Sequence, residues 1–254
     1  MNAEFAVPLS LGKGSQSSST AALEGGQLLS ASNERAFWKP LQDRLAGVPH
    51  TDTSAHQLLT MLLAHCYPIE DADLLAQALL TRFGSMGAVL AAPASQLRAL
   101  AENAEGCVGL LKGMHQAMAL ALREPVLNRP ILKRWSDLEA YLRISLGHEA
   151  EEVVRLLFLD TRNALLLDEE HARGTINHTP VYPRKIVARV LETRATALII
   201  VHNHPSGDPM PTQEDINMTR LLARVLDGIG VSLHDHIVVG RHRCESLRKL
   251  GLFS

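Results

Sequence analysis

The 254-residue sequence lacks the features that mark several classes of protein. It has no apolar run near the roughly 18 residues that a membrane-spanning helix needs, the tightest being Ala197–Val201. Its 17 Gly and 12 Pro residues are not in excess, which excludes collagen-like and low-complexity chains. The first ten residues carry no Lys or Arg, and no apolar stretch follows before Gly12. We therefore expect no secretory signal, a cytoplasmic protein and no membrane partner.

Cysteines are few, and basic residues are not in excess over acidic ones. Three cysteines (Cys66, Cys107 and Cys244) lie too far apart in the sequence for a disulfide framework or a Cys-x-x-Cys zinc site. Residues 1–150 carry 12 basic and 14 acidic residues, and residues 151–254 carry 13 of each. Because neither half has the basic excess that phosphate backbones attract, the charge does not support strong DNA binding.

The distribution of Leu and Ala against Val and Ile predicts two domains, which follow an N-terminal tail. Residues 1–33 are rich in Ser and Gly and poor in apolar side chains, so we expect a disordered tail. Residues 41–122 contain only four Val or Ile among many Leu and Ala, which favours helices, whereas residues 151–240 contain seventeen, which favours a sheet. We predict a helical domain over residues 37–124 and a sheet-containing domain over residues 125–254, with 123–150 as the connection.

Apolar spacing and turn residues set the expected elements. In the first domain we expect five short helices: Ala55–Ala64, Asp71–Phe83, Ser85–Leu90, Ser95–Leu100 and Gly109–Arg123. In the second we expect a hairpin of Val153–Leu159 with Ala164–Leu167, a helix Pro183–Arg194, the strand Ala197–Val201, a helix from Thr212 to Gly228 and a strand region Val231–Val239. The last two helices are expected to bury Ile186, Val187, Val190 and Leu191, and Met218, Leu221, Leu222, Val225 and Ile229. This order indicates an α/β or α+β fold.

The most informative segment begins where the strand Ala197–Val201 ends, with His202-Asn203-His204-Pro205-Ser206-Gly207. Residues two apart at a strand end project to the same side, so His202 and His204 would face one ion. Asp215 lies three residues inside the next expected helix, where its carboxylate can turn back toward the strand end. Two imidazoles and a carboxylate suit Zn²⁺ and leave a position for water, as in catalytic zinc sites. On spacing alone, Thr212-x-x-Asp215 equally fits a helix cap without any metal.

The whole pattern, His-x-His, seven residues and then Ser/Thr-x-x-Asp, resembles the JAMM motif of MPN-domain metalloproteases. The stretch His-Asn-His-Pro-Ser-Gly, with Pro-Thr-Gln-Glu-Asp after it, is similar to the form carried by the RadC family of bacterial proteins. Further stretches match that family in order: Gly174-Thr175-Ile176-Asn177, Val181-Tyr182-Pro183-Arg184 and Asp235-His236-Ile237-Val238-Val239-Gly240. The resemblance covers residues 125–253, and residues 41–122 more loosely. It implies an MPN/JAB-like mixed sheet flanked by helices, preceded by a small all-α domain.

The resemblance also implies which residues hold and use the metal. Zinc would be bound by His202, His204 and Asp215, and a Glu on the first strand would take a proton from water. The family pattern places this Glu immediately before the first strand's apolar run, and strand parity puts Glu152 on the face of its apolar side chains. We therefore predict Glu152 as the base and keep Glu151 as the alternative.

MPN proteases use a serine hydroxyl to stabilise the oxyanion, and Thr212 stands at that position here. If Thr212 instead caps the helix with its hydroxyl, the oxyanion role weakens, and Ser206 is then the substitute donor. The second His-x-His, His234-Asp235-His236, is not expected to bind the metal; we expect it to support the sheet near the site.

These features predict a zinc-dependent hydrolase acting on a peptide or isopeptide bond of an unidentified peptide or protein substrate. The alternative is a DNA-associated repair protein, as the family's name suggests, in which the metal is structural or acts on nucleic acid. Family members often carry a Gly-x-Gly helix–hairpin–helix that grips DNA backbone, but the corresponding stretch, residues 105–113, is glycine-rich and lacks that turn. A third possibility is a non-catalytic MPN-like scaffold, although such proteins usually lose the ligands that this chain retains.

Overall fold

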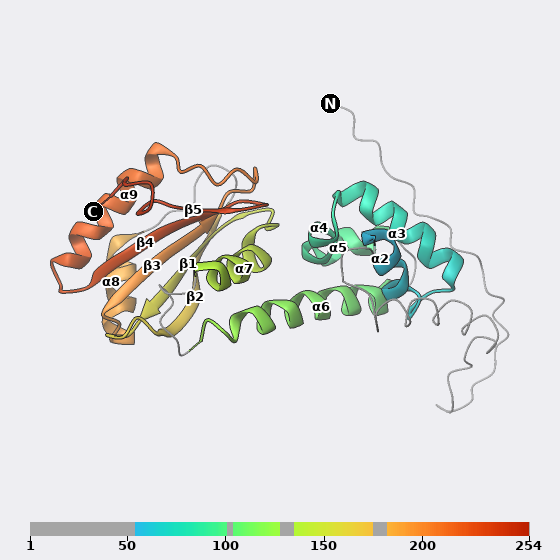
Figure 1. Cartoon of the computed structure of the whole chain (residues 1–254), viewed down its shortest axis with the longest axis horizontal. Helices are drawn as coiled ribbons and strands as arrows, with labels where there is room; N and C mark the ends of the chain where they lie inside the picture. The colour runs from blue at the N-terminus through green and yellow to red at the C-terminus, as the bar shows by residue number, and fades with distance from the viewer. Residues whose placement is uncertain (1–53, 101–103, 128–134, 175–181, 254) are drawn as a thin grey trace. The chain divides into compact units, whose positions relative to one another are not determined.

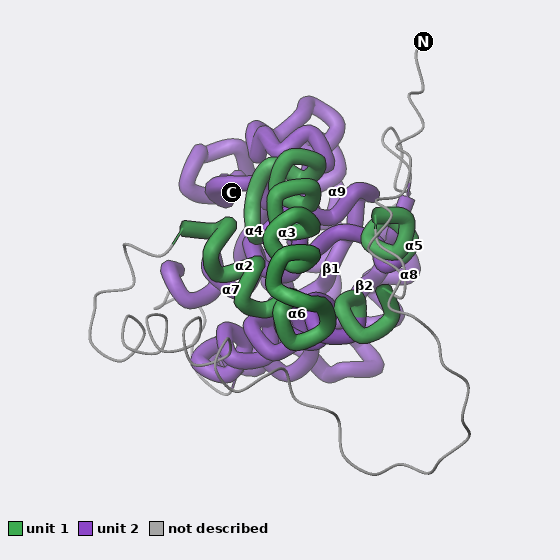
Figure 2. Tube along the Cα trace, turned by 90° about the vertical axis from the view of Figure 1, so that its right-hand side faces the viewer, with its two compact units in different colours: residues 1–86, 95–108 green, residues 87–94, 109–254 purple. Residues whose placement is uncertain are grey.

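The computed structural model describes residues 54–100, 104–127, 135–174 and 182–253 (Figure 1). The chain divides into two compact units, one of residues 1–86 and 95–108 and one of residues 87–94 and 109–254 (Figure 2). The tail predicted for residues 1–33 lies outside the described residues. Within the described ranges, no helix combines the length and the apolar character needed to cross a bilayer.

The described part of the first unit is helical. It contains α2 (Ala55–Leu63), α3 (Ile69–Phe83), α5 (Ala94–Arg98) and the beginning of α6 (Glu105–Arg123). Ser54 caps α2 in a reciprocal arrangement with Gln57, and α3 ends at Gly84, whose φ of 82° suits a residue without a side chain. Buried Leu, Ala and Val side chains form the interior of this unit. The predicted helices are confirmed, with ends that differ by up to four residues.

The second unit is built on a five-stranded mixed sheet. Its elements in chain order are α4 (Met86–Ala91), the rest of α6, α7 (Trp135–Leu146), β1 (Glu152–Leu159), β2 (Leu165–Gly174), α8 (Pro183–Thr193), β3 (Ala197–Asn203), α9 (Gln213–Asp227), β4 (Ser232–Val239) and β5 (Cys244–Ser246). The strand order is β2-β1-β3-β4-β5. β3 runs parallel to β4, and every other neighbouring pair is antiparallel.

Helices cover both faces of this sheet (Figure 1). On one face, Leu138, Leu142 and Leu146 of α7 pack on inward residues of β1, β3 and β4. On the other face, α8 and α9 pack on the alternate residues of the same strands. Because both faces are covered, β3 is buried at every position, which explains its continuous apolar sequence. The predicted α/β class, a mixed sheet flanked by helices after an all-α segment, is confirmed.

Several local predictions were wrong for identifiable reasons. The predicted connection 123–150 contains the helix α7, whose buried Leu138, Leu142 and Leu146 repeat at helical spacing. β5, a strand of three residues, was not predicted. The buried stripe of α9 runs through Thr219, Leu222 and Leu226, so the predicted Leu221 and Ile229 are exposed, as is Leu191 on α8. The buried stripe of α9 therefore includes a polar residue, Thr219, which points into the unit.

Candidate metal centre

The end of β3 presents two imidazoles on one side of the sheet. β3 is the middle strand, between β1 and β4, and His202 is its penultimate residue. His204 follows directly after the strand, and its backbone N–H donates to the carbonyl of Val239 over 3.1 Å, which continues the contact with β4. The His202 side chain is almost fully buried, and that of His204 is about one-sixth exposed. The site therefore lies where a buried strand meets solvent.

The first turn of α9 supplies the carboxylate. Thr212 is the N-cap residue, and Asp215 stands at the third helical position. The backbone N–H and the hydroxyl of Thr212 both donate to Asp215 Oδ2 over 2.7 Å, and the Asp215 N–H donates back to Thr212 Oγ1 over 3.2 Å. This reciprocal cap fixes the carboxylate, which also lies at the favourable, positive end of the helix. The two alternatives for this segment, a helix cap and a metal ligand, are thus compatible.

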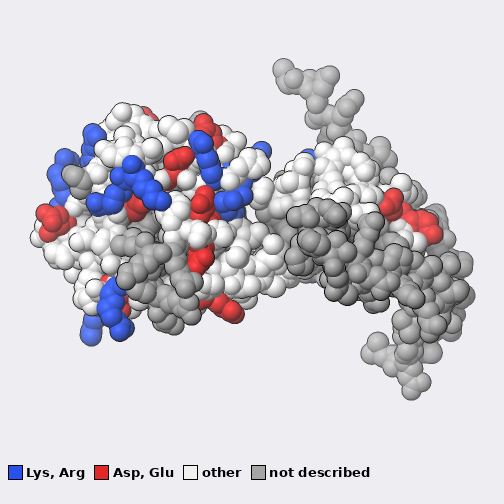
Figure 3. Space-filling model, viewed as in Figure 1, with Lys and Arg blue, Asp and Glu red and all other residues white. Residues whose placement is uncertain are grey.

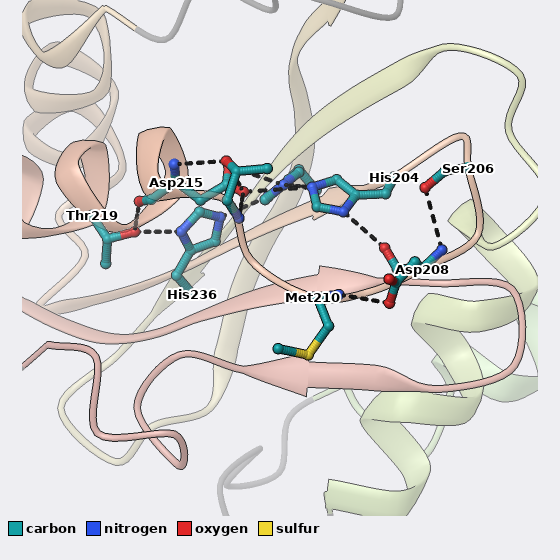
Figure 4. A network of polar contacts seen from close by, with 9 residues as sticks. His204, Ser206, Asp208, Met210, Asp215, Thr219 and His236 are labelled. Carbon is teal, nitrogen blue, oxygen red and sulfur yellow. Dashed lines mark hydrogen bonds and ion pairs between the residues drawn. The ribbon is translucent and has the colours of Figure 1, made fainter.

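The three predicted ligand side chains converge, and Figure 4 shows two of them, His204 and Asp215, turned toward each other. His202 Nε2 lies 3.1 Å from His204 Nε2 and 3.2 Å from Asp215 Oδ1, and His204 Nε2 lies 3.5 Å from Asp215 Oδ2. A tetrahedral zinc ion with bonds of about 2.0–2.1 Å holds its ligand atoms about 3.3 Å apart. The three groups therefore fit zinc in spacing as well as in chemical type, and three protein ligands leave a fourth position open.

Hydrogen bonds at the Nδ1 atoms of His202 and His204 orient both imidazoles so that their Nε2 atoms face Asp215. His204 Nδ1 donates to the backbone carbonyl of Asp208 over 2.8 Å, so its Nε2 carries the lone pair that a metal needs. His202 Nδ1 lies 2.8 Å from Nε2 of His236, a fully buried residue on β4. His236 does not belong to the group of potential ligands and lies behind His202, on the side away from the other two.

The charges at the site favour a cation between the three groups. Burial raises the pKa of the Asp215 carboxyl, but hydrogen bonds with His202 and His204 outweigh it and hold that pKa well below its usual range. The hydrogen bond with Asp215 also raises the pKa of His204 above the ordinary histidine value, although burial opposes this. Without a metal, a proton on His204 thus takes over part of the neutralisation of Asp215.

The raised pKa of His204 predicts how zinc binding depends on pH. Zinc must displace the proton from His204, so its affinity should fall by about tenfold per pH unit below that pKa, since one proton is released. Zinc dissociation constants measured by chelator competition from mildly alkaline to mildly acidic pH would show this slope. An affinity that does not change over this range would contradict the assignment of His204 as a ligand.

A short loop, residues 205–211, holds His204 in place and is packed against the end of β4. Gly207 adopts a φ of 88°, which a residue with a side chain rarely does. At Gly240 the fit is tighter, because an added Cβ would lie 2.5 Å from the Gly207 carbonyl oxygen and 2.6 Å from Pro209 Cδ. The loop backbone reaches its position only because residue 240 has no side chain.

We therefore expect Gly240→Ala to displace the loop that carries the Asp208 carbonyl. The free energy of unfolding should fall by about 1–3 kcal/mol, as for other overpacked sites, and zinc affinity should fall with it. Gly113→Ala in α6 is the matched control, since a Cβ there meets no atom within 4 Å. Urea unfolding of the wild type and both variants tests this, and a Gly240→Ala protein as stable as the wild type would contradict it.

The two candidate bases point in different directions. Val154 of β1 pairs with His202 of β3, so Glu152, two residues earlier, lies on the face that carries both histidines. The hydrogen bond with Asp215 is the largest cause of the raised pKa of His204, and the negative charge of Glu152 raises this pKa further. The carboxylate of Glu151 is half exposed and lies 3.7 Å from Arg173 Nη1. The geometry favours Glu152.

The two candidate oxyanion donors differ in the use of their hydroxyl groups. Thr212 donates its hydroxyl hydrogen to Asp215, as described above, which removes it from a substrate. Ser206 Oγ accepts from the backbone N–H of Asp208 over 3.3 Å, and its own hydrogen has no acceptor among the described residues. Ser206 therefore keeps a donor for a ligand, whereas Thr212 is used by the helix cap.

Three residues besides the predicted ligands also support the site. Asn203 and Thr219 were not predicted to do so, whereas His236 was expected to support the sheet near the site. The side chain of Asn203 accepts from the Val153 N–H over 2.9 Å and donates to the Glu151 carbonyl over 3.0 Å, which fixes the start of β1 beside the site. His236 and Thr219 form the support behind His202. The sequence held a signal for His236, because a second His-x-His, His234-Asp235-His236, lies in the predicted strand region Val231–Val239. Nothing in the sequence distinguished Thr219 from an ordinary helix residue.

The sequence of this region is similar to sequences of known proteins. The family model described as RadC-like JAB domain matches residues 132–252, which include both histidines, the loop and the start of α9. A relative from Rhodobacter capsulatus, described as a UPF0758 protein, is 46% identical over 197 residues, which is 78% of this chain and 92% of that relative. The mixed sheet, the His-x-His at the end of its middle strand and these similarities agree: the chain belongs to the RadC family.

Proposed function

We propose that this protein is a zinc-dependent hydrolase of the JAMM type that cleaves a peptide or isopeptide bond. The observation that supports this most strongly is the convergence of His202, His204 and Asp215, whose ligand atoms lie within 4.8 Å of one another, with Glu152 on the same face. A bound zinc ion would supply Lewis acidity, which polarises a carbonyl and lowers the pKa of water. Three ligands without a fourth protein donor are typical of catalytic rather than structural zinc.

The proposed mechanism gives each nearby residue a task. Glu152 takes a proton from the attacking water and later returns it to the leaving amine, which a carboxylate on the open side of the site is suited to do. Ser206, in preference to Thr212, donates its hydroxyl hydrogen to the developing oxyanion. Asn203 holds the start of β1 and with it Glu152. In this proposal the catalytic domain comprises residues 125–254, and residues 37–124 form a separate helical domain.

A peptide library tests the proposal without knowledge of the natural substrate. The zinc-loaded protein is incubated with peptides from a digested bacterial proteome and with Lys-branched isopeptides, and new amino termini are identified by mass spectrometry. Cleavage should stop when a chelator removes zinc and return when zinc is added. If the zinc-loaded protein cuts neither class of peptide, the proposal is wrong.

The DNA-associated alternative gains no specific support. Residues 105–113 lie within the single helix α6, so this glycine-rich stretch does not form the hairpin turn that grips DNA backbone. On the face shown in Figure 3, basic and acidic side chains of the described residues are interspersed rather than separated. Binding to duplex DNA that falls steeply with salt concentration would favour the alternative.

A further inference from the structure

A chain of three hydrogen bonds runs from the ligand His202 back to the backbone of the ligand Asp215. Figure 4 shows the part of this chain from His236 through Thr219 to Asp215. His202 Nδ1 lies 2.8 Å from His236 Nε2, and His236 Nδ1 lies 2.5 Å from Thr219 Oγ1. Thr219 Oγ1 in turn donates over 2.5 Å to the carbonyl oxygen of Asp215, one helical turn earlier in α9. The chain thus connects β3, β4 and α9, the three elements around the site.

The direction of every bond in this chain is determined by its last acceptor. The Asp215 carbonyl cannot donate, so the hydrogen between it and Thr219 Oγ1 must come from the hydroxyl. The hydroxyl oxygen then accepts from His236, which places the His236 proton on Nδ1. In the neutral ring Nε2 is left as an acceptor, so His202 donates from Nδ1. With the His202 ring neutral, as a metal ligand must be, its Nε2 is the nitrogen with the lone pair, and this nitrogen lies 3.2 Å from Asp215 Oδ1.

The opposite order of donors and acceptors along this chain of hydrogen bonds is unfavourable. It would require Thr219 to donate to His236 Nδ1, which leaves two oxygens, Thr219 Oγ1 and the Asp215 carbonyl, 2.5 Å apart with no hydrogen between them. It would also place a proton on His202 Nε2 and remove that nitrogen from metal binding. Only the first direction is compatible with a ligand at His202.

The chain is protected from competing partners. Thr219 and His236 are fully buried and His202 is 2% exposed, so bulk water does not compete for these hydrogen bonds. The neighbouring carboxylate of Asp235 accepts from Ser246 Oγ and from the backbone N–H groups of His236 and Arg248, away from the His236 ring. The state of the His236 ring is therefore set by Thr219 on one side and by His202 on the other.

We propose that Thr219 and His236 are positioning residues that hold His202 in the tautomer able to bind a metal. The inference rests on the metal-binding part of the proposed function. His204 meets the same need with a backbone carbonyl, which is an acceptor in any state. An imidazole can either donate or accept, so His236 requires Thr219 to fix its own proton, and this explains a hydroxyl buried in the apolar interface between α9 and the sheet.

Two substitutions at Thr219 separate this role from packing. Thr219→Val keeps the shape of the side chain and removes the hydroxyl, so His236 loses its acceptor and its proton can move to Nε2. Zinc affinity, measured by competition with a chromogenic chelator, should then fall by about 10–100-fold, as when other residues that hydrogen-bond to a metal ligand are replaced. Thr219→Ser keeps the hydroxyl, so the zinc affinity of this variant should remain close to that of the wild type. A purely packing role predicts the opposite order, because serine removes a buried methyl group and valine does not.

A spectroscopic measurement reports the tautomer itself. Long-range ¹H–¹⁵N correlation spectra of the metal-free protein in mildly alkaline buffer distinguish protonated from unprotonated ring nitrogens. We expect His236 to carry its proton on Nδ1 in the wild type and in Thr219→Ser, and on Nε2 to a larger extent in Thr219→Val. A wild-type His236 protonated on Nε2 would overturn the inference.

The result is distinguishable from a failure of the proposed function. Equal zinc affinities of the wild type and both Thr219 variants would overturn the positioning role and leave the hydrolase proposal standing. Conversely, a protein that loses zinc affinity in Thr219→Val but cuts no peptide would support the positioning role and overturn the hydrolase proposal.

Discussion

Glu152→Gln is expected to leave zinc bound and to lower kcat for peptide cleavage by about 10²–10⁴-fold, the usual contribution of a general base. Glutamine has the same size and hydrogen-bonding reach as glutamate, but its amide cannot take a proton from water. Glu152 lies on the face of His202 and His204 through the register of β1 with β3, so the change acts directly at the site. The measurement combines zinc content with turnover of any peptide that the library identifies.

Glu151→Gln is the matched control, because it makes the same chemical change at the adjacent position. The Glu151 carboxylate is half exposed and pairs with Arg173, so turnover should remain close to that of the wild type. If Glu151→Gln abolished turnover and Glu152→Gln did not, the base would be Glu151. A Glu152→Gln protein that also lost its zinc would show that this residue holds the metal.

His204→Ala should have the largest effect on metal binding. It removes one of the three proposed ligands that the described residues offer, so zinc affinity should fall by more than the roughly 10–100-fold expected when a residue supporting a ligand is lost. It also leaves the ionised Asp215 carboxylate, whose pKa is held low partly by His204, with one neighbour fewer. Isothermal titration with zinc measures the change, and cleavage should be lost in parallel.

His242→Ala is the control, because it removes a histidine that lies outside the proposed metal site. His242 is exposed and does not belong to the group of potential ligands, so both zinc affinity and stoichiometry should be unchanged. Thermal unfolding of the metal-free proteins separates loss of a ligand from loss of the fold, since His204 is partly exposed and lies after the strand. A His204→Ala protein that binds zinc as tightly as the wild type would exclude His204 from the site.

Much of the site could be predicted because its residues lie close together in the sequence. His202, His204 and Asp215 occupy a single strand–loop–helix unit, and the alternation of a strand and the position of a helix cap determine where such side chains point. The spacing alone left a cap and a metal ligand as alternatives, and the structure shows that Asp215 makes the cap with one oxygen and faces the histidines. Glu152 could be chosen over Glu151 by strand parity.

The supporting residues could not be predicted in this way, because they depend on how distant elements pack. Thr219 contacts His236 only because β4 lies beside β3 and α9 crosses over both, and no local pattern encodes that arrangement. For the same reason the buried face of α9 was predicted wrongly, with Leu221 placed inward and Thr219 overlooked. The hydrophobic pattern favours apolar residues for the interior, whereas this helix points a hydroxyl inward.

His202, His204 and Asp215 are proposed to bind one zinc ion with an open fourth position. Crystals of the zinc-loaded protein, measured on both sides of the zinc absorption edge, locate the metal directly. The structure predicts a single anomalous peak within bonding distance of His202 Nε2, His204 Nε2 and an oxygen of Asp215, with solvent as the remaining ligand. Zinc found elsewhere in the chain, or no zinc at these three residues, would contradict it.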